Sequence, residues 1–383
     1  MKLKKILIIT ISVLMCLSVV ACSNKSATNK ENLDKIVLGT MGPLTGSNAI
    51  YGISTSNGIK LAVEQRQTVL GKPVELLSVD DKADQTEAVN AYNKFVNNDN
   101  VVAIVGATTS GSSLSVAITS VKNGTPILTP TGTVPEITTS GENVFRACYT
   151  DPFQGEMMAQ FAFNLGLKNI AIMENIDSSY SEGVKSSFIS KFEELGGKVL
   201  TVEGYKEQDN DFKSQILKIG ELQAEALFIP DYYTKAYLIA SQVKDMGLSS
   251  LENIVLLGSD GWDGIHTVAE DISVLENSYF CSHYSLEDEE PVVQDFVNAY
   301  KSKYGENPTA FSALGYDGAN IMMNAIEKAG STDSKAIIEA LKNTEYKGVT
   351  GNIKFDENGD PIKGVSIIQI QNGQYKLFDK IEK

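Results

Sequence analysis

From Leu33 onward the chain alternates short apolar runs with amphipathic stretches. Apolar residues at helical spacing, such as Ala88, Tyr92 and Phe95, predict helices, whereas short runs rich in Val and Ile predict strands. We expect strands over 35–41, 73–81, 101–106, 126–130, 144–150, 169–175, 198–205, 226–230 and 253–259. We expect helices over 54–68, 86–99, 111–123, 153–165, 180–195, 211–220 and 234–247. Strands that alternate with helices predict βαβ units and parallel sheets.

Two alternating runs of comparable length follow each other, with a break near residue 148. Together they are longer than one hydrophobic core usually serves. We therefore predict an α/β fold with two doubly wound parallel-sheet lobes. In open parallel sheets, ligands bind just past the carboxyl ends of the strands.

The segments that follow these strand ends are rich in Gly, Ser and Thr, with aromatic residues placed among them. They read GTMGPLTGSNAIYG (39–52), GATTSGSSL (106–114), TPTGTVPEIT (129–138), NIDSSYSEG (175–183), IPDYYTK (229–235) and GSDGWDG (258–264). Such loops form a polar cradle with apolar walls, which suits a small molecule.

The N-terminus has the layout of a secretory signal, with three early lysines, an apolar run over 6–20 and a small residue at 21. The apolar run is shorter than the roughly 20 residues that span a membrane. Val19-Val20-Ala21-Cys22 resembles a bacterial lipobox, which predicts a signal peptide over 1–21 and lipidation of Cys22. Residues 22–34 are then a lipid-anchored tether on the extracytoplasmic face of the cell membrane.

Charge narrows the classes of partner. The formal net charge is -15, and loss of the three lysines in 1–21 would lower it to -18. An acidic chain of this kind argues against nucleic acid and against a polybasic membrane patch. Two histidines and no C-x-x-C spacing predict no metal site and no cofactor.

Nine segments in order resemble the type I periplasmic binding protein family, most closely its branched-chain amino acid (Leu/Ile/Val) binding branch. They are GPLTGSNAIYG, DDKADQTEAV, VVAIVGATTSGSS, PILTPTGTVPEIT, FRACYTDPFQG, SSYSEG, PDYYTK, LGSDGW and AFSALGYDGANIMMNAI. The resemblance implies two lobes joined by a multi-strand hinge. The expected N-terminal lobe is 35–148 plus 284–349, and the expected C-terminal lobe is 149–283 plus 350–383. Ala83 and Thr109 stand where that branch often carries a disulfide.

An amino acid needs partners for its carboxylate. Ser110 begins the helix after a buried strand, where free N–H groups and the helix dipole favour an anion, although a simple N-cap is the alternative. The resemblance implies that Gly132 offers its carbonyl to the ligand ammonium. It also implies that Thr133 offers an N–H and a hydroxyl to the ligand, against the alternative of a plain turn before Pro135.

The ammonium needs an anionic partner. Asp260 is the acid in LGSDGW, directly after a strand, and can form a charge-assisted bond. The resemblance places an acid, commonly Glu, in the same role. A solvated turn aspartate is the alternative, with Asp231 and Asp263 as neighbouring candidates.

Aromatic residues in the same loops predict the wall of a side-chain pocket, with packing between the lobes as the alternative. These residues are Tyr51, Tyr180, Tyr232 and Trp262.

No enzyme signature is present: SGSSLS and SYSEG are not G-x-S-x-G elbows, and GTMGPLTG is not G-x-G-x-x-G. The resemblance implies capture of an amino acid in the interlobe cleft by a monomer, with delivery to the permease and ATPase subunits of an ABC importer. A sensory module that reports amino acids or amides to a signalling receptor is the alternative function.

Cys148 and Cys281 remain after the signal and lipid cysteines are set aside. The resemblance places both in neighbouring interlobe crossings. We expect them to lie close in space, either as a disulfide or as two buried thiols that pack as small hydrophobes.

Overall fold

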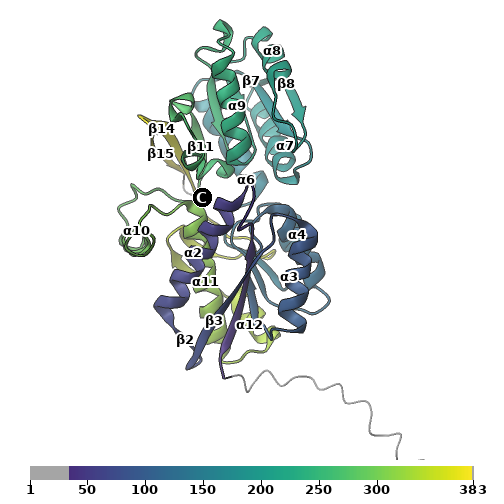
Figure 1. Ribbon diagram of the computed structural model, residues 1–383, viewed down its shortest axis with the longest axis vertical. Helices are drawn as coiled ribbons and strands as arrows, with labels where there is room; N and C mark the ends of the chain where they lie inside the picture. Colours follow the sequence, from purple (N-terminus) through teal and green to yellow (C-terminus); the bar gives the residue numbers. More distant parts are fainter. Residues whose placement is uncertain (1–33, 382–383) are drawn as a thin grey trace, which may run out of the picture. The chain divides into compact units, whose positions relative to one another are not determined.

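The computed structural model describes residues 34–381, and the lipobox and the signal segment lie outside them. Two large sheets carry the fold (Figure 1). The first has the order β2-β3-β1-β4-β5-β6, and the second has the order β15-β14-β11-β10-β9-β7-β8. The predicted α/β fold with two lobes is therefore confirmed.

The first sheet is parallel apart from β2, which runs antiparallel to β3. Its strands are β1 (Ile36–Gly42), β2 (Thr68–Val69), β3 (Lys72–Asp80), β4 (Ala103–Val105), β5 (Ile127–Thr129) and β6 (Val144–Arg146). Every residue of β1 is buried, as expected for a central parallel strand.

Helices cover both faces of the first sheet (Figure 1). Helices α3 (Gln85–Asn97) and α4 (Ser110–Ser120) pack on one face, with Tyr92 and Phe95 buried against the strands. Helices α2 (Ala49–Arg66) and α11 (Ala310–Ala329) pack against each other on the opposite side. The crossing is close: a Cβ added to Gly58 would lie 1.9 Å from the Ser312 carbonyl oxygen, and one added to Gly315 would lie 2.3 Å from that of Thr55.

The second sheet is parallel over β8-β7-β9-β10-β11, and β14 and β15 extend it antiparallel. Its strands are β7 (Asn169–Asn175), β8 (Lys198–Tyr205), β9 (Ala226–Phe228), β10 (Val255–Gly258), β11 (Tyr279–Ser282), β14 (Val365–Gln371) and β15 (Gln374–Ile381). Two separate apolar clusters, one on each face, form its core.

One face of the second sheet is covered by α6 (Asp151–Asn164) and α7 (Ser179–Glu194), and the other by α8 (Lys213–Glu221) and α9 (Tyr233–Asp245). The remaining elements are α5 (Glu136–Thr139), α10 (Pro291–Tyr304), α12 (Ser334–Lys342), the hairpin of β12 (Glu345–Gly348) and β13 (Gly351–Lys354), and the short 3₁₀ turns η2 (Ser249–Leu251), η3 (Asp260–Trp262), η4 (Ile265–Thr267) and η5 (Ile272–Leu275).

Elements from the late part of the chain contact both sheets. Helix α11 packs on β4 and β5 of the first sheet, whereas β14 pairs with β11 of the second. This division agrees with the expected return of the chain between lobes, but the exact lobe boundaries stay a prediction.

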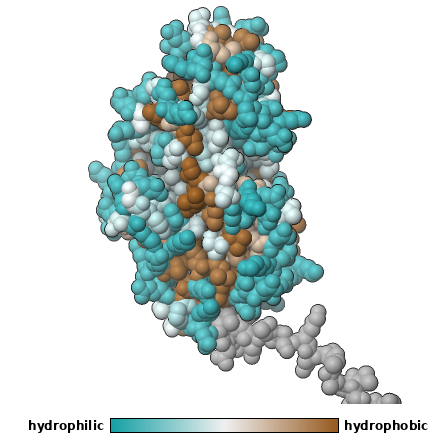
Figure 2. Space-filling view, in the orientation of Figure 1, coloured by the Kyte–Doolittle hydropathy of each residue, from teal (hydrophilic) through white to brown (hydrophobic). Residues whose placement is uncertain are grey.

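The visible face in Figure 2 is largely hydrophilic, with a narrow apolar strip.

Both remaining cysteines are buried free thiols. Cys148 lies between β6 and α6, and Cys281 lies within β11 opposite Ile367 of β14. Burial raises the pKa of Cys148 to about 12 and also raises that of Cys281. Because both thiols are free, the disulfide alternative is not realised. The closeness of the two residues stays a prediction.

Candidate functional site

Six of the eight predicted ligand-binding residues line one small cavity. They are Tyr51, Ser110, Thr133, Tyr180, Tyr232 and Asp260. The same cavity is lined by Thr108, Thr109, Thr131, Gly261 and Phe311. Its volume is about 10 Å³, which is roughly the space of one water molecule. A whole amino acid therefore enters only when the surrounding segments move apart.

Hydroxyl groups and a helix start form one part of this cavity. Ser110 is the first residue of α4, and its Oγ lies 3.1 Å from Thr133 Oγ1 and accepts a bond from the Thr133 N–H at 3.2 Å. The buried Thr109 hydroxyl has no hydrogen-bond partner among the described residues. The first N–H groups of a helix lack partners within the helix, and its dipole favours negative charge there. This part of the cavity is suited to a carboxylate.

A buried acid forms another part of the small cavity. Asp260 begins η3, directly beyond β10, and is 3 % exposed. Tyr180 donates its phenol to Asp260 Oδ1 at 2.6 Å, and His283 Nε2 lies 3.1 Å from Oδ2. Within residues 34–381 no lysine or arginine forms an ion pair with this carboxylate. The negative charge therefore has only neutral donors beside it and can accept a cationic group.

Aromatic rings form the apolar wall. Tyr51 stacks on Phe311 with ring centroids 4.3 Å apart and meets the edge of Tyr232 at 5.3 Å. Tyr232 stacks on Tyr180 at 5.1 Å. These four rings bring α2, α7, α11 and the start of α9 to one point. They would shield an apolar side chain from water.

Tyr51 also links the two lobes. Its hydroxyl donates to the Gly261 carbonyl and accepts the Tyr233 N–H at 3.0 Å. Tyr233 in turn donates its phenol to the Ser47 carbonyl at 2.6 Å. Helix α2 belongs to the first sheet, whereas Gly261 and Tyr233 follow strands of the second. The structure is therefore closed over the cavity by direct contacts between the lobes.

Gly132 and Trp262 are the two predicted residues that do not line the cavity. The Gly132 carbonyl accepts from Arg146 Nη1 at 3.0 Å and from the Cys148 thiol at 3.2 Å. The Trp262 indole is fully buried and donates to the Ile229 carbonyl at 2.9 Å. Both residues support the loops that carry the cavity.

The two alternative acids are engaged elsewhere. Asp231 Oδ2 accepts from Tyr205 at 2.6 Å and from Asn175 at 3.1 Å. Asp263 accepts the N–H of Ala310. Burial raises the pKa of Asp231 to about 6 and that of Asp263 to about 7. Neither acid lines the small cavity, so Asp260 is the acid that the geometry favours.

A further buried acid stands behind the cavity. Asp151 is fully buried at the start of α6, and its Oδ1 accepts from Gln154 at 3.0 Å. Burial raises the pKa of Asp151 to about 8, and the nearby Asp260 charge acts in the same direction. Gln154 also accepts the N–H of Asp260 at 3.2 Å, so one side chain connects the two acids.

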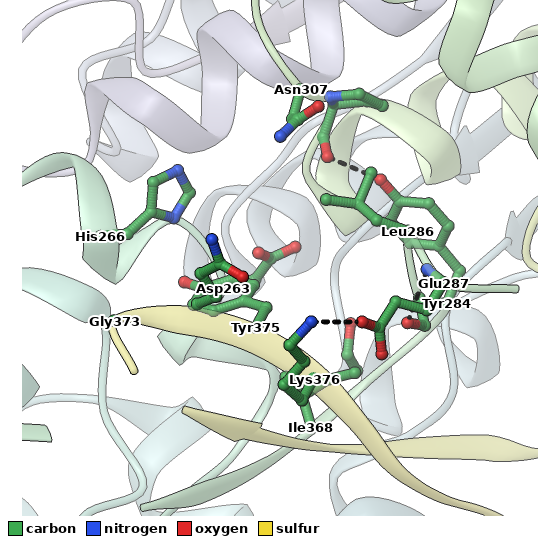
Figure 3. Close-up of a pocket in the computed structure, with 14 residues that line it drawn as sticks. Asp263, His266, Tyr284, Leu286, Glu287, Asn307, Ile368, Gly373, Tyr375 and Lys376 are labelled. Atoms are coloured by element: carbon green, nitrogen blue, oxygen red, sulfur yellow. Dashed lines mark hydrogen bonds and ion pairs between the residues drawn. The ribbon is translucent and has the colours of Figure 1, made fainter. Parts of the chain in front are cut away.

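A larger cavity of about 380 Å³ lies elsewhere, between the β14–β15 hairpin and the segment after β11 (Figure 3). Two pairs of its polar groups bond with each other. Lys376 pairs with Glu287 at 2.8 Å, and Tyr284 donates to the Pro308 carbonyl at 2.6 Å. Six of the eight predicted ligand-binding residues line the small cavity and none of them lines this one, so its larger size alone does not make it the better site.

Two features of the site do not follow from the local sequence pattern. The hydroxyl residues Thr108, Thr109 and Thr131 lie in the polar strand-end loops, where the pattern does not distinguish them from their neighbours. Phe311 and His283 come from segments beyond the two alternating runs, and only the tertiary fold brings them here. In residues 34–381 no cluster of three or more His, Cys, Asp or Glu could hold a metal ion.

Comparison with known proteins supports the same reading of the fold. The family described as periplasmic binding protein matches residues 35–374. The leucine-, isoleucine-, valine-, threonine- and alanine-binding protein of Pseudomonas aeruginosa is 30 % identical over 334 residues, which cover 85 % of this chain and 87 % of that protein.

Solved structures of other binding proteins have a similar fold. The leucine-binding protein LivK of Thermotoga maritima has a TM-score of 0.85 and 36 % identity, and the match covers 91 % of this chain and 99 % of that one. LivJ of Streptococcus pneumoniae, solved in complex with isoleucine, has a TM-score of 0.85 and 27 % identity, covering 91 % and 100 %. Since the family match spans nearly all the described residues, this chain belongs to the type I periplasmic binding proteins, a family of substrate-binding proteins rather than enzymes.

Proposed function

We propose that this protein captures a branched-chain amino acid in the small cavity between its lobes and delivers it to an ABC importer. The observation that carries the proposal is the buried carboxylate of Asp260, which accepts from neutral donors and forms no ion pair with a lysine or arginine of the described residues. An α-ammonium group supplies the missing positive charge, while the start of α4 with Ser110 and Thr133 receives the α-carboxylate.

The lining of the cavity supports a neutral, apolar ligand side chain. Rings from Tyr51, Tyr180, Tyr232 and Phe311 surround the site, and among residues 34–381 no lysine or arginine lines the cavity. Its single carboxylate is already assigned to the ammonium, so a basic ligand side chain finds no second anion. Leucine, isoleucine and valine fit these conditions, in agreement with the ligands after which the Pseudomonas aeruginosa and Thermotoga maritima proteins are named.

Binding closes the lobes around the ligand. A ligand that contacts both lobes stabilises the closed form relative to the open one by its differential affinity. Helix α4 belongs to the first sheet and Asp260 to the second. An amino acid held between them bridges both lobes, and the closed form is then the one that docks on the permease.

The proposal extends to the membrane. Lipidation at Cys22 would hold the protein on the extracytoplasmic face, beside its permease. The described residues contain no helix that is long and apolar enough to cross a membrane.

Calorimetry with three ligands tests the site. L-Leucine carries both charged groups, 4-methylpentanoate lacks the ammonium, and isopentylamine lacks the carboxylate. We expect L-leucine to bind at least about 100-fold more tightly than either analogue, because each analogue leaves one buried partner unpaired. Equal affinity for leucine and 4-methylpentanoate would contradict the ammonium site. A charged amino acid as the tightest ligand would contradict the ligand class.

A cellular assay tests delivery. Deletion of the gene should abolish high-affinity uptake of radiolabelled leucine, and the wild-type gene should restore it. Unchanged uptake, together with a lost transcriptional response to leucine, would instead support a sensory role.

A further inference from the structure

His283 contacts the site from the strand next to Asp260. Strands β10 and β11 are parallel neighbours, with Gly258 opposite Phe280. Asp260 lies two residues beyond Gly258, and His283 lies three residues beyond Phe280. Both therefore leave the sheet at the same edge, and His283 Nε2 reaches Asp260 Oδ2 at 3.1 Å.

The surroundings of the ring determine which nitrogen carries the proton. His283 Nδ1 is buried with no hydrogen-bond partner among the described residues, whereas Nε2 faces a carboxylate oxygen. A proton on Nδ1 would leave a buried donor unpaired and place the Nε2 lone pair against a negative oxygen. The neutral ring therefore carries its proton on Nε2 and donates it to Asp260.

The ring is also held in place and kept neutral. Its face stacks on Tyr149 with centroids 3.8 Å apart. Burial lowers the pKa of His283 to about 4, although the hydrogen bond to Asp260 opposes this change. At neutral pH the imidazole is a donor without a positive charge.

We propose that His283 is a positioning residue for the ligand's ammonium group: its neutral imidazole fixes the orientation of the Asp260 carboxylate and leaves the negative charge of that carboxylate free for the ligand. This inference rests on the proposed function of the small cavity. Tyr180 holds Oδ1 and His283 holds Oδ2, each through one hydrogen bond. Each oxygen keeps a further lone pair for the incoming ammonium. A lysine or arginine in the place of His283 would neutralise the carboxylate and compete with the ligand.

Protonation of His283 should weaken ligand binding, as a lysine or arginine at this position would. The imidazolium would pair with Asp260 and repel the ammonium, so the protonated form binds ligand poorly. The other groups near the ring are Tyr149 on its face, Lys363, whose charge further lowers the pKa of His283, and Asp260 itself. A cavity that His283 also lines carries Asp288, Glu290, Lys347 and Lys380, which form two ion pairs with each other.

Two substitutions of His283 distinguish a role in positioning the Asp260 carboxylate from a role in packing alone. His283→Gln places an amide donor near the position of Nε2, whereas His283→Leu keeps the approximate size and removes the donor. For His283→Leu at pH 7 we expect leucine affinity to fall about ten-fold or more, while 4-methylpentanoate affinity changes less than about three-fold. His283→Gln should stay within about three-fold of wild type for both ligands. Equal loss for both ligands in His283→Leu, or no loss for leucine, would overturn the proposal.

The second histidine is the matched control. His266 packs edge-on against Tyr375 and lines the larger cavity of Figure 3. His266→Leu and His266→Gln should leave both affinities unchanged. If wild-type protein itself fails to prefer leucine over 4-methylpentanoate, the proposed function fails, which is a different outcome from a failure of the His283 proposal.

Nitrogen NMR of wild-type protein tests the proposal without any change to the site. The chain has two histidines, and His266→Gln assigns their signals. We expect His283 to be a neutral ring protonated on Nε2 at pH 7, to titrate near pH 4, and to titrate still lower with leucine bound. A His283 ring that is charged at pH 7, or whose titration leucine does not alter, would overturn the proposal even if His283→Leu does not fold.

Discussion

Tyr180 donates its phenol to Asp260 across 2.6 Å and so ties helix α7 to the loop after β10. The same hydroxyl lies 2.7 Å from Ser259 Oγ and accepts the Gly261 N–H at 2.9 Å. Because three consecutive loop residues contact one phenol, the carboxylate stands on a rigid support. This support fixes where the Asp260 carboxylate lies.

Asp260→Asn should weaken leucine binding by about 2–5 kcal/mol, because it removes one partner of a desolvated charge pair. Calorimetry at pH 7 measures the change. Asp263→Asn is the matched control, since that acid lies in the same loop but lines the other cavity. Near-wild-type affinity in Asp260→Asn would remove this residue from the ammonium site.

Tyr51→Phe should weaken binding by about 1–2 kcal/mol, because it deletes two hydrogen bonds between the lobes and keeps the stack on Phe311. Calorimetry gives the affinity, and small-angle scattering of the unbound protein gives the degree of closure. A variant that binds as tightly as wild type would show that these contacts do not favour the closed form.

Arg146→Lys should lower the free energy of unfolding by about 3–5 kcal/mol. The buried guanidinium donates to Asp360 at 2.6 Å and to the carbonyls of Gly132 and Val134. Lysine cannot make this set of bonds. Urea denaturation measures the loss, and Lys347→Gln, which breaks an exposed ion pair, should leave stability nearly unchanged.

Asp151 should make the unbound protein less stable as the pH rises. Burial raises the pKa of Asp151 from its usual 3.8 to about 8 in the folded protein. The folded state therefore holds a proton that the unfolded state releases, and this contribution is complete below about pH 4 and is lost as the pH rises through 8. Asp151→Asn should gain stability relative to wild type from pH 5 to pH 8. A difference that stays constant over this range would contradict the raised pKa.

Cys22→Ser should release the protein from membranes or stop its processing, because the lipid is attached to that thiol. Fractionation followed by mass spectrometry measures both outcomes. A serine variant that stays in the membrane fraction with the wild-type lipid mass would contradict the lipobox prediction.

The alternating pattern predicted the long helices and the central strands of the two runs, but neither the short strand β2, the short helix α5 nor the exact ends of the elements. Helix α2 begins at Ala49 rather than at 54, because its first turns are held by packing and by bonds to Tyr233 rather than by an apolar stripe. Strand β4 covers Ala103–Val105 and is shorter than the apolar run 101–106, although the N–H groups of Val102 and Gly106 still donate to Val37 and Leu128 of the neighbouring strands.

The structure brings together, in one cavity, predicted residues from the segments that follow strands, such as Ser110, Thr133 and Asp260, and their part in ligand binding stays a prediction. Local pattern places such residues at the sheet edge. The sequence pattern did not predict Phe311 and His283, because their positions depend on how the late helices and strands return to the two sheets. It also could not show that the Gly132 carbonyl is already bonded to Arg146, which is 14 residues away.

The two buried thiols have a practical consequence for measurement. The reactive form of cysteine is the thiolate, and burial raises the pKa of both Cys148 and Cys281. In a soluble version that starts after Cys22, neither should react readily with a maleimide dye. Ile118 on α4 is 60 % exposed and Leu217 on α8 is 49 % exposed, one beside each sheet. Cysteines introduced at these two positions would therefore accept a donor and an acceptor fluorophore, and energy transfer between them would report lobe closure in real time.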